Sequence, residues 1–137
     1  MTAKLINPYS QISPKSAKKI LLVEDNDVNR MLLSDYLTHC GYCIKSLPAG
    51  SGFLSTIKDF QPQVILLDLK LPDVDGYSLL KFLKQDPSHS CIPVIVISAF
   101  AFASDKEQAM KLGANHYMVK PVNLTELMTA IEQHLVH

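Results

Sequence analysis

The 137-residue chain has no tryptophan, only three cysteines and no excess of charge of either sign. Thirteen basic residues balance thirteen acidic ones, so no net field favours direct binding to nucleic acid or to an anionic membrane. The apolar runs are much shorter than the roughly 20 residues that span a bilayer, which argues against membrane insertion. No stretch near Met1 has the apolar core of a secretory signal. We therefore expect a cytoplasmic protein whose partners are other proteins.

The cysteines do not indicate a disulfide framework, because their number is odd. Cys40 and Cys43 have the spacing of a C-x-x-C motif, but no second ligand pair accompanies them, and they close a helical segment instead of opening one. We expect these two residues and Cys91 to be reduced, partly buried thiols.

The length suits a single domain, since domains cluster at about 100 to 150 residues. Residues 1–17 contain Pro8, Pro14 and several small polar residues, a composition that favours a mobile leader. We expect one folded domain over residues 18–137.

Short β-branched or leucine-rich runs alternate five times with longer amphipathic segments, which predicts five βα units and a parallel sheet. The expected strands cover residues 19–24, 42–47, 64–67, 92–97 and 116–119. Apolar residues at helical spacing predict an amphipathic helix after the first strand; they are Val28, Met31, Leu32, Tyr36 and Leu37. The segment 104–112 has little apolar anchorage, so we expect its helix to be the loosest.

Polar side chains follow four of these strands. Glu24 and Asp25 follow the first strand, Asp68 the third, Ser98 the fourth and Lys120 the fifth. The carboxyl ends of parallel strands lie side by side, so these residues should converge on one site. Three neighbouring carboxylates repel one another unless they share a cation, and their oxygens suit Mg²⁺. The pattern predicts phosphoryl transfer to Asp68, with Lys120 and Ser98 stabilising the transferred group.

Each of these residues taken singly has an ordinary explanation. Acids at positions 24 and 25 favour a helix start, Ser98 is a common strand-end residue, and Lys120 reads as a solvated surface lysine. Asp68, like Asp73, reads as a loop acid. Their joint placement at one edge of the sheet is what indicates a functional site.

In order and spacing, four short segments resemble the response regulator receiver domain of two-component signalling: Val23-Glu24-Asp25-Asn26, Asp68-Leu69-Lys70-Leu71-Pro72, Ser98-Ala99 and Lys120-Pro121. The resemblance covers about residue 18 to the end. It implies a flavodoxin-like, doubly wound (βα)5 fold with a five-stranded parallel sheet in the order 2-1-3-4-5. It also implies a phosphoacceptor signalling domain, not an enzyme, that assists its own phosphorylation and dephosphorylation.

Position by position, the resemblance assigns roles to the residues around the strand ends. Asp68 would accept a phosphoryl group from a histidine kinase or a histidine phosphotransfer protein. Asp25, Asp68 and the backbone carbonyl of Lys70 would bind Mg²⁺, and Glu24 would act through a water molecule. The Lys120–Pro121 peptide bond would be cis, which is permitted for X-Pro bonds.

The resemblance also implies a switch. A phosphoryl group on the domain would pull Ser98 inward and let Tyr117 move from an exposed to a buried position. That movement would change the face that contacts a downstream protein, whose identity the sequence does not reveal. Phosphorylation-dependent homodimerisation is a further output that the resemblance implies.

Two positions depart from commoner receiver sequences. Lys70 places a long cation two residues after Asp68, and Phe100 places a bulky ring two residues after Ser98. We hypothesise that Phe100 shields the acyl phosphate from water and slows its hydrolysis. The direction of any effect of Lys70 stays open.

Three alternative functions stay open. An aspartyl-phosphate hydrolase of the haloacid dehalogenase type normally has a second aspartate where this chain has Lys70, and a flavodoxin-like nucleotide or flavin binder normally has a glycine-rich phosphate loop after its first strand. A degenerate receiver would be a binding module that works without phosphate. Residues 23–30 resemble receivers attached to hybrid sensor kinases, whereas the leader starting at Met1 favours a stand-alone regulator.

Overall fold

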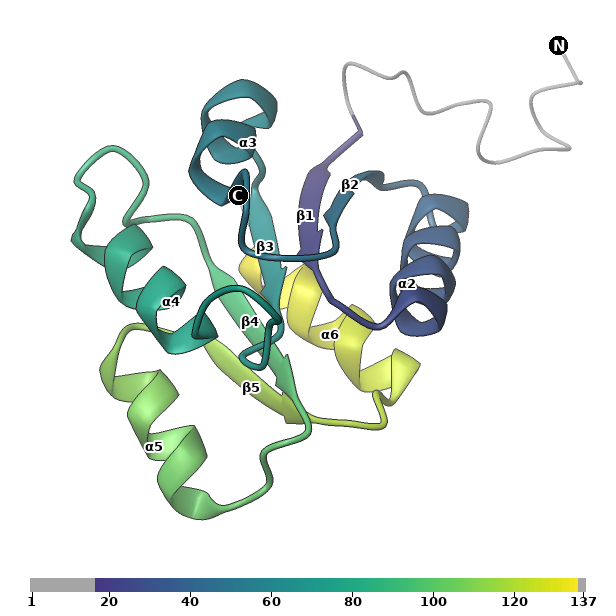
Figure 1. Ribbon diagram of the computed structural model, residues 1–137. Coiled ribbons are helices and arrows are strands. Elements are labelled where there is room, and N and C mark those ends of the chain that lie inside the picture. The colour runs from purple at the N-terminus through teal and green to yellow at the C-terminus, as the bar shows by residue number, and fades with distance from the viewer. Residues whose placement is uncertain (1–16, 136–137) are drawn as a thin grey trace, which may run out of the picture.

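The computed structural model describes residues 17–135, in which five parallel strands form one sheet in the order β2-β1-β3-β4-β5 (Figure 1). The strands are β1 (Lys19–Val23), β2 (Cys43–Leu47), β3 (Val64–Leu67), β4 (Val94–Ser98) and β5 (His116–Val119). The helices are α2 (Asp27–His39), α3 (Phe53–Phe60), α4 (Gly76–Gln85), α5 (Ala103–Lys111) and α6 (Leu124–His134). This arrangement confirms the predicted fold class and strand order. Residues 1–16 of the predicted leader lie outside the described residues.

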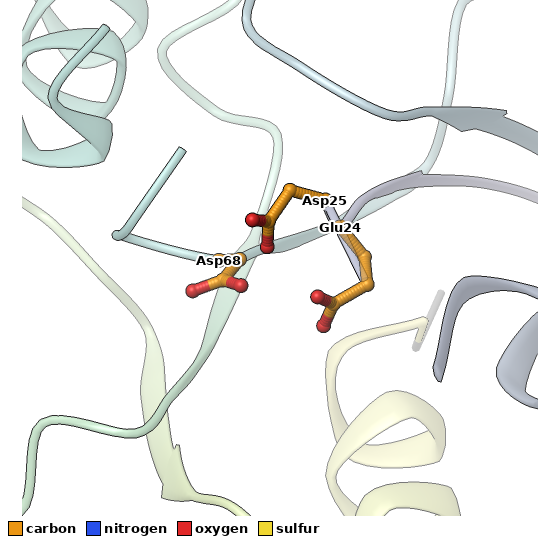
Figure 2. Close-up of side chains that lie close together, drawn as sticks. All are labelled: Glu24, Asp25 and Asp68. Atoms are coloured by element: carbon orange, nitrogen blue, oxygen red, sulfur yellow. The ribbon is translucent and has the colours of Figure 1, made fainter. Parts of the chain in front are cut away.

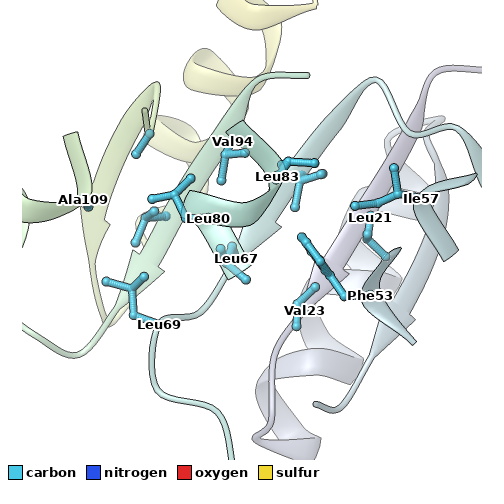
Figure 3. Close-up of a cluster of buried hydrophobic side chains, with 13 residues drawn as sticks. Leu21, Val23, Phe53, Ile57, Leu67, Leu69, Leu80, Leu83, Val94 and Ala109 are labelled. Carbon is cyan, nitrogen blue, oxygen red and sulfur yellow. The ribbon is translucent and has the colours of Figure 1, made fainter. Parts of the chain in front are cut away.

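Different helices cover the two faces of the sheet, because successive side chains of a strand point to opposite faces. Leu21 and Val23 pack with α3, α4 and α5, whereas Ile20 and Leu22 pack with α2 and α6. Figure 3 shows the first of these layers, in which the α3 and α4 side chains lie over β1 and β3. Strand β3 lies in the middle of the sheet and is buried at all four positions. Strand β3, which precedes Asp68, is therefore packed against the core on both of its faces.

Strand pairing aligns the carboxyl ends of β1, β3, β4 and β5, the four strands that polar residues follow. Val23 pairs with Leu67 and Ser98 pairs with Val119. The amide of Asp68 donates to the Val23 carbonyl at 3.0 Å, and the amide of Lys120 donates to the Ser98 carbonyl at 2.8 Å. Backbone hydrogen bonds thus continue one residue past the strands and deliver the predicted site residues to one edge of the sheet.

Helix α2 forms where the spacing predicted it, but the structure buries only part of the apolar set. Leu37 is buried as expected and Leu33 joins it, but Val28, Met31 and Leu32 are each 59% exposed. The apolar residues of α2 form two stripes on the helix, and only the stripe of Leu33 and Leu37, four residues apart, faces the sheet. An apolar stripe therefore remains on the surface of α2.

Helix α5 is the least anchored helix of the described chain, in agreement with the prediction for residues 104–112. It buries only Ala109, whereas α2 and α3 each bury two residues and α4 and α6 each bury three. The Tyr77 hydroxyl donates to the Asp105 carbonyl at 3.1 Å and ties α5 to α4. This helix can shift at a small cost in buried apolar area.

All three cysteines are free, but only Cys40 is partly buried. Cys43 and Cys91 are exposed, which corrects the prediction of partly buried thiols. Cys43 lies in the edge strand β2, where helices leave part of the strand uncovered, and Cys91 lies in the connection before β4. Within residues 17–135, no helix has the length and apolar character needed to cross a bilayer.

Candidate functional site

Three carboxylates meet where β1 and β3 end. One oxygen from each of Glu24, Asp25 and Asp68 can be chosen so that all three lie within 4.8 Å of one another. Figure 2 shows the three side chains grouped at this edge, two from the β1 end and one from the β3 end. The structure therefore brings together the acids that the sequence placed 43 and 44 residues apart.

The three acids differ in burial. Glu24 is 1% exposed and Asp68 is 3% exposed, whereas Asp25 faces solvent. Burying a carboxylate costs free energy unless the charge is paired. Glu24 and Asp68 must therefore have a partner, and Asp25 is the acid best placed to meet an incoming ligand.

Lys120 is that partner. Its Nζ lies 2.8 Å from Glu24 Oε1 and 2.9 Å from Asp68 Oδ2. Lys120 arrives from the end of β5 and is followed by a cis bond to Pro121, as predicted. One ammonium thus bridges two buried carboxylates.

Burial and neighbouring charges shift the pKa of both Glu24 and Lys120. Burial raises the pKa of the Glu24 carboxyl above its ordinary value, and the nearby charge of Asp68 adds to this, although the hydrogen bond from Lys120 opposes it. Burial also acts to lower the pKa of Lys120, but the hydrogen bonds and charges of Glu24 and Asp68 outweigh it, so the pKa of Lys120 is raised. The site holds its cation firmly and would accept further positive charge.

Backbone amides fix the orientation of both buried carboxylates. The Asn26 amide donates to Glu24 Oε2 at 3.0 Å, and the Lys70 amide donates to Asp68 Oδ1 at 3.1 Å. Lys70 also forms an isolated antiparallel bridge with Asp75, which folds the β3–α4 loop back on itself. The exposed Lys70 side chain and the Asp68 carboxylate are therefore held at the start of one compact loop.

Ser98 and Tyr117, the predicted switch pair, are joined through Phe100. The fully buried Ser98 accepts a hydrogen bond at Oγ from the Phe100 amide at 3.1 Å. The half-buried Tyr117 donates from its hydroxyl to the Phe100 carbonyl at 2.8 Å. The Phe100 ring is partly buried and packs against the core on the α3–α5 face. Any displacement of Ser98 that moves the Phe100 backbone will disturb the Tyr117 hydrogen bond.

Asp73 has a role that the sequence did not indicate, since it reads there as a loop acid. Its two oxygens accept hydrogen bonds from the amides of Gly50 at 2.8 Å and Ser51 at 2.9 Å. Donation by the Gly50 amide, followed by that of Ser51, lowers the pKa of the Asp73 carboxyl despite an opposing desolvation effect. A Cβ on Gly50 would clash with Val74 Cγ1, so the close approach of the two segments favours glycine at this position. These contacts tie the β3–α4 loop to the β2–α3 connection.

Arg30 also went unnoticed in the sequence. Its Nη1 donates to the Glu24 carbonyl at 2.9 Å and to the Asp25 carbonyl at 3.4 Å. The one available signal is compositional, because Arg30 is the only arginine beside twelve lysines.

A cavity of about 850 Å³ lies beside the acidic cluster. Its walls come from α2 and from the segment that joins β5 to α6, and they include Glu24, Leu32, Tyr36, Lys120 and Val122. The apolar stripe of α2 continues from it, because Leu32 belongs to both. The site thus opens onto a largely apolar surface.

Comparison with known proteins identifies the family. The sequence family described as response regulator receiver domain matches residues 20–132. The chain belongs to the response regulator receiver family. This receiver is 33% identical over 118 residues to the polar-differentiation response regulator DivK of Brucella ovis, covering 86% of the chain and 96% of DivK.

Two further relatives set the limits of the comparison. The receiver is 32% identical to the transcriptional regulatory protein GltR of Pseudomonas aeruginosa over 85% of the chain, but it spans only about half of that relative, 48%. Among solved structures, it superposes with a TM-score of 0.79 on the receiver domain of the sensor histidine kinase PA1611 of Pseudomonas aeruginosa PAO1. The two sequences are 29% identical, and the superposition covers 87% of this chain and 98% of the PA1611 domain. The PA1611 structure has a magnesium ion coordinated in its active-site cleft.

The side chains of this receiver fit a divalent cation. Glu24, Asp25 and Asp68 supply carboxylate oxygens, the ligand type that Mg²⁺ prefers. Lys120 supplies one positive charge beside two of the three carboxylates, so the cluster keeps an excess of negative charge for a further cation. The cluster has room for solvent on the side of Asp25, which is exposed.

Proposed function

We propose that this receiver accepts a phosphoryl group on Asp68 and acts as a phosphorylation-dependent switch in two-component signalling. The observation that carries the proposal is the pairing of two buried carboxylates with one lysine beside a third, exposed carboxylate. An acceptor site needs a nucleophilic oxygen, charge stabilisation and access for a donor, and this arrangement supplies all three. We propose a phosphoacceptor and not an enzyme, since the group stays on the protein.

Mg²⁺ would be held by Asp25, Asp68 and the Lys70 carbonyl, with Glu24 acting through water. When bound, it would supply charge stabilisation for the oxygens of the transferred group. The remaining work falls to the chain itself. The Lys70 amide and Lys120 hold the two Asp68 oxygens in place, so the nucleophile is oriented before the donor arrives.

The proposed chemistry is one displacement at phosphorus. An Asp68 carboxylate oxygen forms a bond to phosphorus while the phosphorus–nitrogen bond of a phosphohistidine donor breaks, and the electron pair returns to the imidazole, which takes up a proton. Lys120 neutralises part of the added charge. Ser98 Oγ accepts a hydrogen bond from the Phe100 amide, and its hydroxyl, which also interacts with the Tyr117 hydroxyl, would turn its proton to a phosphoryl oxygen.

The proposed donor is a histidine kinase or a histidine phosphotransfer protein. The cavity beside the site supports this, because a donor must present its imidazole to Asp68 while resting on a surface. Exposed Val28, Met31 and Leu32 on α2 offer apolar area for that contact. We place the reaction in the cytoplasm, where three free cysteines remain reduced.

The proposed switch starts at Ser98. Movement of its hydroxyl toward the phosphoryl group would release the Phe100 amide, and the Phe100 carbonyl bonded to Tyr117 would move with it. The weak anchorage of α5 supports a rearrangement there. The altered face, built from α5, β5 and α6, would then contact a downstream protein.

Incubation with Mg²⁺ and acetyl phosphate, followed by intact mass measurement, tests the proposal. Wild type should gain one phosphoryl adduct that hydroxylamine removes, and Asp68→Asn should gain none. Asp59→Asn, an exposed acid on α3, is the matched control and should behave as wild type. An adduct on Asp68→Asn, or none on wild type, would refute phosphoacceptance at this residue. Chemical-shift changes at Tyr117 that persist in Asp68→Asn would refute the switch.

A further inference from the structure

We infer that Arg30 is a positioning residue, which holds the Glu24–Asp25 backbone so that both carboxylates are oriented toward the proposed Mg²⁺ site. The inference rests on the proposed Mg²⁺ site. Arg30 Nη1 donates to the Glu24 carbonyl at 2.9 Å and to the Asp25 carbonyl at 3.4 Å. Nη2 contacts Asp27 Oδ1 at 2.6 Å. One guanidinium therefore joins the start of α2 to the turn that carries both acids.

Local structure does not explain an arginine at this position. Arg30 lies in the first turn of α2, where its amide makes an early helical hydrogen bond to the Asn26 carbonyl. The positive end of the helix dipole disfavours a cation there. The ion pair with Asp27 offers little in return, because the Asp27 side chain is 88% exposed and its charge is screened by water. The contacts with the two carbonyls are what remain to account for the residue.

The choice of arginine over lysine fits this role. The chain has twelve lysines and this single arginine. A guanidinium is a rigid planar fork whose donors reach several acceptors at once, whereas an ammonium is a point charge on a flexible stem. Arg30 satisfies two carbonyls and a carboxylate on different residues, and its side chain is only 20% exposed. The geometry of the fork, and not the charge alone, is what the position uses.

The charge of Arg30 and its positioning of the metal ligands predict opposite effects of Arg30→Gln on Mg²⁺ affinity. A cation near a Mg²⁺ site repels the ion, so Arg30→Gln would tighten Mg²⁺ binding if only charge mattered. If Arg30 holds the ligands, the same substitution weakens binding, by about tenfold, the lower end of what partners of metal ligands contribute. Arg30→Lys keeps the charge and loses the fork, so it should also weaken binding.

Isothermal titration of the whole protein with Mg²⁺ alone separates these views. We expect weaker binding for both Arg30→Gln and Arg30→Lys, and a change below about twofold for Asp27→Asn, which keeps an Oδ1 acceptor for Arg30 and removes only the exposed negative charge. Lys45→Gln, an exposed cation on β2, is the charge control and should match wild type. Denaturant unfolding of each variant without Mg²⁺ shows which variants are folded. If Arg30→Gln does not fold, Arg30→Lys carries the test.

The outcomes are distinct. Unchanged affinity in Arg30→Lys, or tighter binding in Arg30→Gln, would overturn the positioning role while leaving the proposed function intact. Absence of Mg²⁺ binding by wild type would overturn the metal site of the proposed function, and this inference with it. Weaker binding in both Arg30 variants, with both control variants unchanged, would support the inference.

Discussion

Replacing Lys120 with methionine removes the one ammonium that joins two buried carboxylates. Methionine has a similar length and no charge, so the packing of the stem changes little. Glu24 and Asp68, 1% and 3% exposed, would then face each other without a cation. We predict that Lys120→Met destabilises the metal-free protein and makes its stability depend on Mg²⁺.

The contact distances give the size of the effect. At 2.8 and 2.9 Å, each contact is worth about 6 kcal/mol before desolvation, with an effective dielectric constant near 20. Desolvation of the ammonium offsets much of this sum, and breaking one side of a buried pair typically costs about 3 to 5 kcal/mol. The Lys120 side chain is 20% exposed, so water screens it in part. We therefore expect a loss near the lower end, about 3 kcal/mol.

Urea unfolding at neutral pH with chelator measures the loss, and the same titration with Mg²⁺ measures the recovery. Binding at a hundred times Kd stabilises any folded protein by about 2.7 kcal/mol. Without its competing ammonium, Lys120→Met should bind Mg²⁺ more tightly and gain more than wild type at equal concentration. In an Asp68→Asn background, the loss caused by Lys120→Met should shrink, because one of the two carboxylates is already neutral. Equal stability of wild type and Lys120→Met without Mg²⁺ would refute this reasoning.

Three further predictions concern the neighbouring residues. Phe100→Ala should shorten the lifetime of the phosphorylated protein if the ring excludes water, and an unchanged decay by intact mass would remove that hypothesis. The pKa of Glu24 is raised in the folded protein, so its carboxyl gains a proton as the pH falls through that pKa. The metal-free protein should then become more stable and its Mg²⁺ affinity should drop. Glu24→Gln should flatten both pH dependences, measured by denaturant unfolding and by Mg²⁺ titration at a series of pH values. Gly50→Ala should destabilise by about 1 to 3 kcal/mol through the clash with Val74, and Val74→Ala should restore part of the loss in denaturant unfolding.

Periodicity was enough to predict five βα units and a parallel sheet, and strand-end chemistry was enough to predict the group of site residues, whereas the strand order followed from the resemblance to receiver domains. The run of residues 64–67 is apolar throughout, as a central strand covered on both faces must be, and it therefore points directly to Asp68. Placement of Glu24, Asp25, Ser98 and Lys120 follows in the same way, because parallel strands share one carboxyl edge. Their roles in phosphoryl transfer stay a prediction.

Side-chain partners were not predictable in this way. The spacing of Val28, Met31 and Leu32 fits a buried helix face as well as Leu33 and Leu37 do, and only packing against the sheet decides which stripe is covered. Asp73 and Arg30 look like ordinary surface charges, since their acceptors and donors are backbone groups whose position depends on loop geometry.

The amino-acid sequence alone therefore determined the alternation of strands and helices and the acids, hydroxyl and lysine at the strand ends, because these depend on local period and on the topology of a parallel sheet. The tertiary structure decided that Lys120 bridges Glu24 and Asp68, that Phe100 links Ser98 to Tyr117, and that Arg30 holds the acidic turn. The Tyr117 and Lys120 contacts join residues 17 to 96 positions apart in sequence, whereas the Ser98–Phe100 and Arg30 contacts depend on the conformation of the connections after β4 and β1. Only the packed fold sets these distances of about 3 Å.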